Sequence, residues 1–171
     1  MYHPTIFENL KVAFENYIYD LDNLEQEILI TNRVDRMDFS VLARYFAIEF
    51  TLVNQPDVTA EIVLEASLEE LSAEILEKQG TTPGCNLLLR FYKRVENVTK
   101  QCKQIEQALN EIWDRELQIT QTLSFVYEQG TSTYLDIIEV GFNHKINEEH
   151  MDDITDFLEH VLETLDVLNE I

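Results

Sequence analysis

The chain has 171 residues, of which 33 are acidic and 12 are basic, so its formal net charge is −21 at pH 7. This charge argues against direct binding to nucleic acid or to an anionic membrane, and it favours basic proteins, basic peptides or cations as partners. The alternative interpretation is that the acidity only keeps the protein soluble. With 45% hydrophobic residues and only four glycines and three prolines, the composition is that of a folded domain with a full core.

Cysteine usage and the N-terminal segment bear on the compartment. Cys85 and Cys102 fall in different predicted elements and are too few for a disulfide framework or a zinc site. The N-terminal residues lack the basic and apolar blocks of a signal peptide, and no apolar run approaches the roughly 20 residues that span a bilayer. We therefore expect a cytoplasmic protein without a membrane partner.

The first segments predict a helix followed by strands. Apolar side chains recur at intervals of three and four over about residues 5–22, which is typical of an amphipathic helix. A short strand is predicted at 27–34, and residues 35–38 supply a turn before a long strand over 39–53. Because this long strand is apolar on both faces, we expect it in the sheet interior and covered on both sides. A helix is the competing interpretation, since four apolar residues share one helical stripe: Phe39, Leu42, Phe46 and Phe50.

A third strand is predicted at 58–64, where apolar residues alternate with polar ones and give one dry and one wet face. Ser67 and Glu70 have the spacing of a capping box, which opens a helix that stops at Gly80. The segment 80–84 combines glycines with a proline. Residues 1–171 are expected to form a single α+β domain, and this segment is the candidate linker between two halves, 1–80 and 84–171.

The second half predicts a strand at 85–95 and a helix at 98–114. The clearest alternation in the chain, over 117–127, indicates a strand with one solvated face, and it pairs with a strand at 134–142 as a hairpin. Asn147 is placed as the N-cap of a final amphipathic helix, Glu148 to Asn169. The apolar stripe of this helix favours docking onto the sheet, with a coiled-coil or bundle contact to another copy as the alternative.

Together these elements predict an α+β fold. It has an antiparallel-dominated sheet of five or six strands, with about four helices packed on it and a long amphipathic C-terminal helix. By the order of its elements alone the chain resembles the dimeric secretion chaperones, which hold an unfolded segment of a client against their sheets. The helix at 98–114 departs from that class, in which strand runs into strand.

Charge is unevenly distributed along the chain. Residues 81–103 carry five basic side chains and one acidic one, a basic island that includes Arg90, Lys93 and Arg94. The last residues, from Glu148 onward, hold nine acidic side chains and no lysine or arginine. We expect the island and the acidic helix to attract each other within one molecule or across a homodimer, or else to bind a partner. The candidate partner-binding residues are Glu149, Asp153, Asp156, Arg90, Lys93 and Arg94.

Catalytic and metal patterns are weak in this sequence. His150 and His160 lie among carboxylates of the final helix, and one polar face holds residues 149, 153, 156, 160 and 163, but the spacing matches no metal-ligand pattern and a solvated face accounts for it. There is no nucleophile-elbow pattern and no phosphate-binding glycine loop. We therefore expect no enzyme, no cofactor and no metal site.

The expected function is that of a non-enzymatic protein-binding module: an adaptor, an inhibitor or a chaperone-like protein. Its partner is expected to be basic or to present apolar segments. The alternative is an acidic inhibitor that imitates nucleic acid with carboxylates of the final helix and of residues 57–77. A third interpretation is an enzyme with a site of scattered acidic residues. A homodimer is expected because nine phenylalanines and a wide final-helix stripe exceed what one small domain covers.

Overall fold

The computed structural model of the chain describes residues 5–115, 117–128, 130 and 132–171. Six antiparallel strands form one sheet in the order β1-β2-β3-β4-β6-β5. The strands are β1 (Ile28–Asp38), β2 (Ala43–Leu52), β3 (Thr59–Ala66), β4 (Asn86–Val95), β5 (Gln118–Ser124) and β6 (Tyr134–Gly141). The helices are α1 (Ile6–Asn23), α2 (Leu68–Ile75), α3 (Val98–Ile112) and α4 (Ile154–Glu170), with a 3-10 turn η1 (Glu148–Asp153) before α4. The predicted α+β fold is confirmed.

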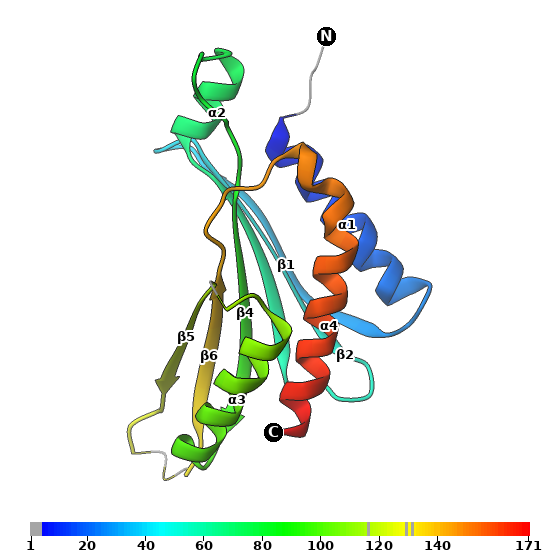
Figure 1. The fold of residues 1–171 in the computed structure, drawn as a ribbon, viewed down its shortest axis with the longest axis vertical. Coiled ribbons are helices and arrows are strands. Elements are labelled where there is room, and N and C mark those ends of the chain that lie inside the picture. Colours follow the sequence, from blue (N-terminus) through cyan, green and yellow to red (C-terminus); the bar gives the residue numbers. More distant parts are fainter. Residues whose placement is uncertain (1–4, 116, 129, 131) are drawn as a thin grey trace.

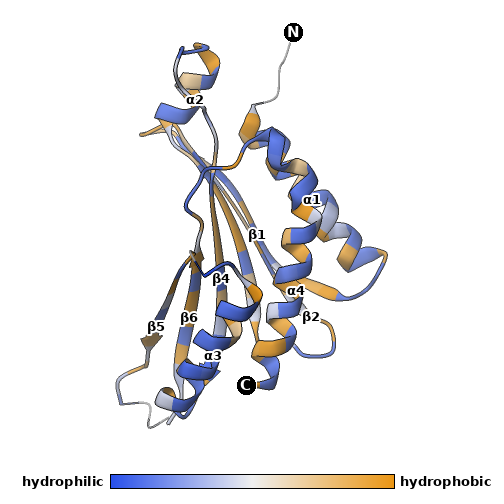
Figure 2. Cartoon of the chain, viewed as in Figure 1, coloured by the Kyte–Doolittle hydropathy of each residue, from blue (hydrophilic) through white to orange (hydrophobic). Residues whose placement is uncertain are grey.

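The long helices α1, α3 and α4 pack on one face of the sheet, and α2 lies at one end of it (Figure 1). The core lies between these helices and the sheet. On β2 the residues that point to the helices, Phe46, Ile48 and Phe50, are all fully buried. Figure 2 shows the corresponding pattern on α4, where hydrophobic residues alternate with hydrophilic ones around the helix. The buried residues of α4 include Ile154, Leu158 and Leu165, so its apolar stripe is used inside the molecule, as the docking interpretation predicts.

Helix α1 is fixed at its start and along one side. Thr5 caps it by accepting a hydrogen bond from the backbone N–H of Glu8, which satisfies one of the free amides of the first turn. Ion pairs then tie the helix to β1: Lys11 to Asp35 at 2.8 Å and Arg33 to Glu15 at 2.7 Å.

The turn predicted at residues 35–38 is wrong. β1 continues through Asp38, and the turn lies at residues 39–42, within the predicted second strand. Contacts with neighbouring elements outweigh the turn propensity of the aspartates: Asp35 accepts from Lys11 of α1, and across the hairpin the guanidinium of Arg36 lies 4.3 Å from the ring centroid of Tyr45. Leu42 takes the left-handed conformation in the turn, with φ of 52°.

The expectation that β2 is covered on both faces is also wrong, although β2 does lie inside the sheet. No helix among the described residues covers the second face (Figure 1), which we call the open face. The predicted wet face of β3 lies there, yet it is largely closed, because Val63 is fully buried and Glu61 is 7% exposed. Neighbouring side chains on the sheet, rather than a helix, shield these positions.

The segment 80–84 does not interrupt the sheet. β3 and β4 on either side of it pair in register from Thr59 with Tyr92 to Glu65 with Asn86. Further along, Trp113 at the end of α3 donates from its indole N–H to the hydroxyl of Thr164 on α4, at 3.0 Å. Both contacts join parts of the chain that are distant in sequence.

Candidate binding groove

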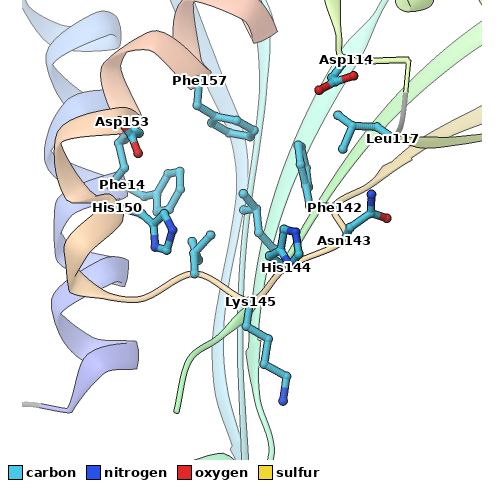
Figure 3. A pocket seen from close by; sticks show the side chains of 13 residues that line it. Phe14, Asp114, Leu117, Phe142, Asn143, His144, Lys145, His150, Asp153 and Phe157 are labelled. Atoms are coloured by element: carbon cyan, nitrogen blue, oxygen red, sulfur yellow. The ribbon is translucent and has the colours of Figure 1, made fainter. Parts of the chain in front are cut away.

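A pocket of about 370 Å³ opens where α1, the start of α4 and the connection after β6 meet. We call this pocket the groove; Figure 3 shows its lining. The connection from β6 to η1 forms one wall. A pair of backbone hydrogen bonds between Cys85 and Ile146, at 2.8 and 2.9 Å, holds this wall beside the start of β4.

The floor of the groove is aromatic. The ring of Phe157 packs edge-on against Phe14 at 5.9 Å and against Phe142 at 5.7 Å. Trp113 contacts both Phe142 and Phe157, with ring centroids 5.9 and 5.7 Å away. Aromatic pairs in this edge-to-face geometry are stabilising beyond the apolar area that they bury. Aliphatic side chains complete the floor: Leu87, Leu117, Ile146 and Ile154.

The rim is polar. It carries Asp114, Asn143, His144, Lys145, His150 and Asp153. The backbone N–H of Asn147 donates to Nδ1 of His150 at 3.1 Å, so a neutral His150 carries its proton on Nε2. Lys145 forms an ion pair with Glu70 of α2, and in Figure 3 its side chain points away from the rings.

The residue types of the lining bear on what the groove can hold. None of the described residues around the groove is a serine, threonine or cysteine, so it offers none of the usual hydroxyl or thiol nucleophiles. Across the part of the chain that the structure describes, no group of three or more His, Cys, Asp or Glu side chains is placed to hold a metal ion. An apolar floor with a few polar groups at the mouth is typical of a site that takes an apolar side chain or ligand.

The candidate acidic residues lie at or near the groove. Asp153 lines it, and Glu149 and Asp156 are exposed on the same stretch of η1 and α4. None of the three forms an ion pair with another described residue. These carboxylates are therefore available to a cationic partner.

The basic island is divided between the two faces of the sheet. Arg90 lies on the open face, where it donates to Glu139 at 2.8 Å and to Glu61 at 3.1 Å. Burial acts to lower the pKa of Arg90, but these two hydrogen bonds outweigh it and raise the pKa above its ordinary value. Lys93 points to the helix side, and Arg94 is exposed. Among the described residues, the island forms no ion pair with the final helix, and the ion pairs of Arg90 are with Glu61 and Glu139.

Sequence reasoning missed a buried carboxylate under α3. Asp136 on β6 is fully buried, its Oδ1 has no hydrogen-bond partner among the described residues, and the thiol of Cys102 approaches Oδ2 at 3.9 Å. Burial raises the pKa of Asp136 to about 6, although Cys102 and Lys93 act to lower it. The sequence does contain an indication of this carboxylate. Side chains alternate between the two faces along β6, and Asp136 falls on the same buried face as Ile138 and Val140.

The groove itself was also missed, because its residues come from four separate segments. Comparisons of the chain with family models, curated proteins and solved structures returned no significant match. None of the helices formed by the described residues combines the length and apolarity needed to cross a bilayer.

Proposed function

We propose that this protein is a non-enzymatic binding module that holds an apolar side chain of a basic protein segment in the groove. The observation that carries the proposal is the aromatic floor of Phe14, Phe142 and Phe157 beneath a polar rim. A buried apolar anchor in such a pocket supplies most of the affinity of many protein interfaces. Adaptor, inhibitor and chaperone-like roles all use this kind of contact.

The negative charge around the groove supports the proposal that the bound protein segment is basic. Asp153 on the rim and its exposed neighbours Glu149 and Asp156 lie on a helix without lysine or arginine. In a chain of net charge −21, the long-range field attracts cations and repels acidic proteins. Lysine or arginine residues flanking the apolar anchor would reach these carboxylates, which have no ion-pair partner among the described residues.

A second candidate is an inhibitor that imitates nucleic acid. The exposed carboxylates along η1 and α4 favour it, since they continue past the groove through Glu159, Glu163 and Asp166. Such an inhibitor would bind a nucleic-acid-binding protein mainly through charge. Its complexes would therefore dissociate as salt screens exposed charges, with a Debye length of about 8 Å at physiological ionic strength.

The experiment is capture of partners from the expressing cell, with washes at rising salt. His144→Trp places a large side chain at the exposed mouth of the groove, and Asn54→Trp adds the same side chain to the exposed turn between β2 and β3 as a control. The proposal expects a salt-resistant partner that is lost with His144→Trp and kept with Asn54→Trp. A partner held equally by both variants contradicts it.

Charge variants separate the two candidates. One triple variant neutralises the carboxylates near the groove, and the other removes the same charge further along the helix. The first is Glu149→Gln, Asp153→Asn and Asp156→Asn, and the second is Glu159→Gln, Glu163→Gln and Asp166→Asn. The groove proposal expects weaker capture with the first variant only, whereas mimicry expects both to weaken it. If even charge reversal in the first set changes nothing, the basic island of Arg90 to Lys103 becomes the surface to test.

A further inference from the structure

We propose that two copies of this chain associate through their β5 strands, which pair antiparallel across a two-fold axis and join the two sheets. Leu117 belongs to both this interface and the groove lining, but the observations behind the inference do not rest on the proposed function. The inference rests on three observations: the chemistry of the β5 edge, its register against itself, and the apolar side chains exposed beside it.

The two edges of the sheet differ in how they are protected. β1 has a register shift between Ile30 and Asn32, and it carries Arg33, Asp35 and Arg36. Bulges and charges of this kind prevent an edge from pairing with another strand. β5, with the sequence QITQTLS, has no charge, no proline and no register shift against β6. Its outer edge has no strand partner in the described sheet.

The sequence of β5 matches itself when two copies run antiparallel about Gln121. Polar side chains then face polar ones on the open face; on the helix side apolar pairs flank a central polar pair, Gln121 with the partner's Gln121. The other pairs are Gln118 with the partner's Ser124, Ile119 with the partner's Leu123, and Thr120 with the partner's Thr122. Threonine pairs and aliphatic pairs opposite each other both stabilise antiparallel strands. A two-fold interface requires this kind of self-complementarity.

Apolar side chains at the end of β5 are left exposed by one copy. Leu123 is 36% exposed and Phe125 is 67% exposed. In the proposed register, Leu123 lies opposite the partner's Ile119, and the next pair on the same side brings Phe125 to the partner's Leu117. Association thus covers apolar surface that the single chain leaves in water.

The charge of the chain favours this edge over other surfaces. Two copies of net charge −21 repel each other, and contact through α4 or α2 would place acidic side chains together. The uncharged β5 edge brings no like-charged pair face to face. It is therefore the place where a second copy meets the least local repulsion.

The test changes Thr120 and Thr122, which are exposed on the open face. In Thr120→Lys/Thr122→Lys, each new lysine lies opposite a lysine of the partner. In Thr120→Lys/Thr122→Glu, the matched control, each lysine lies opposite a glutamate. Sedimentation equilibrium from low to high micromolar protein measures the dimer constant of the wild type and of both variants, and circular dichroism verifies that each is folded.

The proposal expects a wild-type dimer, a roughly tenfold or greater weakening in the Lys/Lys variant, and retention of the dimer in the Lys/Glu variant, because like charges directly opposite destabilise strand pairs. A wild type that stays monomeric at high micromolar concentration overturns the proposal. Equal dimerisation of all three proteins places the interface elsewhere and overturns it as well. Loss of the dimer in both variants contradicts the register.

Discussion

Replacement of Asp136 by asparagine tests whether the buried carboxylate under α3 costs stability at neutral pH. Asp136 is fully buried and has one oxygen without a hydrogen-bond partner among the described residues. Asparagine has nearly the same shape and carries no charge. We expect Asp136→Asn to be more stable than the wild type at pH 7, because burying a charge without full hydrogen bonding is unfavourable.

The size and the sign of the effect follow from linkage. Burial raises the pKa of Asp136 from 3.8 to about 6, so the folded state holds the proton more tightly than the unfolded state does. The stability that this proton contributes is full below pH 4 and is lost as pH rises to about 6. At 1.36 kcal/mol per pKa unit, the gain from Asp136→Asn is about 1.5 kcal/mol at pH 5 and about 3 kcal/mol at pH 7.5.

Urea unfolding at several pH values between 5 and 7.5 measures this difference in the free energy of unfolding. Asp152→Asn, which removes an exposed carboxylate on η1, is the control for the change in net charge. Lys93 lies opposite Asp136 on β4 and loses its partner in the variant, which reduces the absolute gain. The pH dependence is therefore the decisive quantity. A difference between Asp136→Asn and wild type that stays constant from pH 5 to 7.5 would refute the reasoning.

Three further predictions concern single positions. Gly84→Ala should destabilise the protein by about 1 to 3 kcal/mol in thermal unfolding, since the new Cβ would lie 2.8 Å from the carbonyl oxygen of Ile146; an unchanged melting temperature contradicts the tight approach. Tyr92→Phe should cost about 1.5 kcal/mol in urea unfolding, because the hydroxyl donates to Glu61 at 2.8 Å; a neutral result means that water replaces this bond without loss. Burial raises the pKa of the Cys85 thiol to about 12, so Cys102→Ser should resist thiol reagents at pH 8 until it unfolds; rapid native labelling of that variant argues against burial of Cys85.

Side-chain periodicity located the helices and strands in their order along the chain, although it misplaced the turn between β1 and β2. The three-four spacing of Phe7, Leu10 and Phe14 marks the face of α1 that is buried against the sheet. The helix caps at Ser67 and Asn147 were also predicted from the sequence, and both side chains accept hydrogen bonds from the first turns of their helices. These features depend on neighbours within one turn of the chain, so a single sequence contains the information.

Features that depend on distant segments were not predictable in the same way. From the sequence alone, Asp35 is typical of a turn. In the fold it forms an ion pair with Lys11 of α1, which is distant in sequence. The residues of the basic island are close together in sequence. Because side chains alternate between the two faces of a strand, Arg90 and Lys93 nevertheless lie on opposite sides of the sheet. The groove joins Phe14 to Phe142 and Phe157, and no local pattern brings these rings together.

Site-directed photo-cross-linking in the expressing cell tests the central claim most directly. A benzophenone amino acid is placed at His144 in the groove mouth, and in separate proteins at Asn54 in the β2–β3 turn and at Arg94 on the open face; all three positions are exposed. The account predicts that a protein partner cross-links at position 144 and at neither of the other two. Cross-links at 54 or 94, with none at 144, would contradict the assignment of the groove as the binding site.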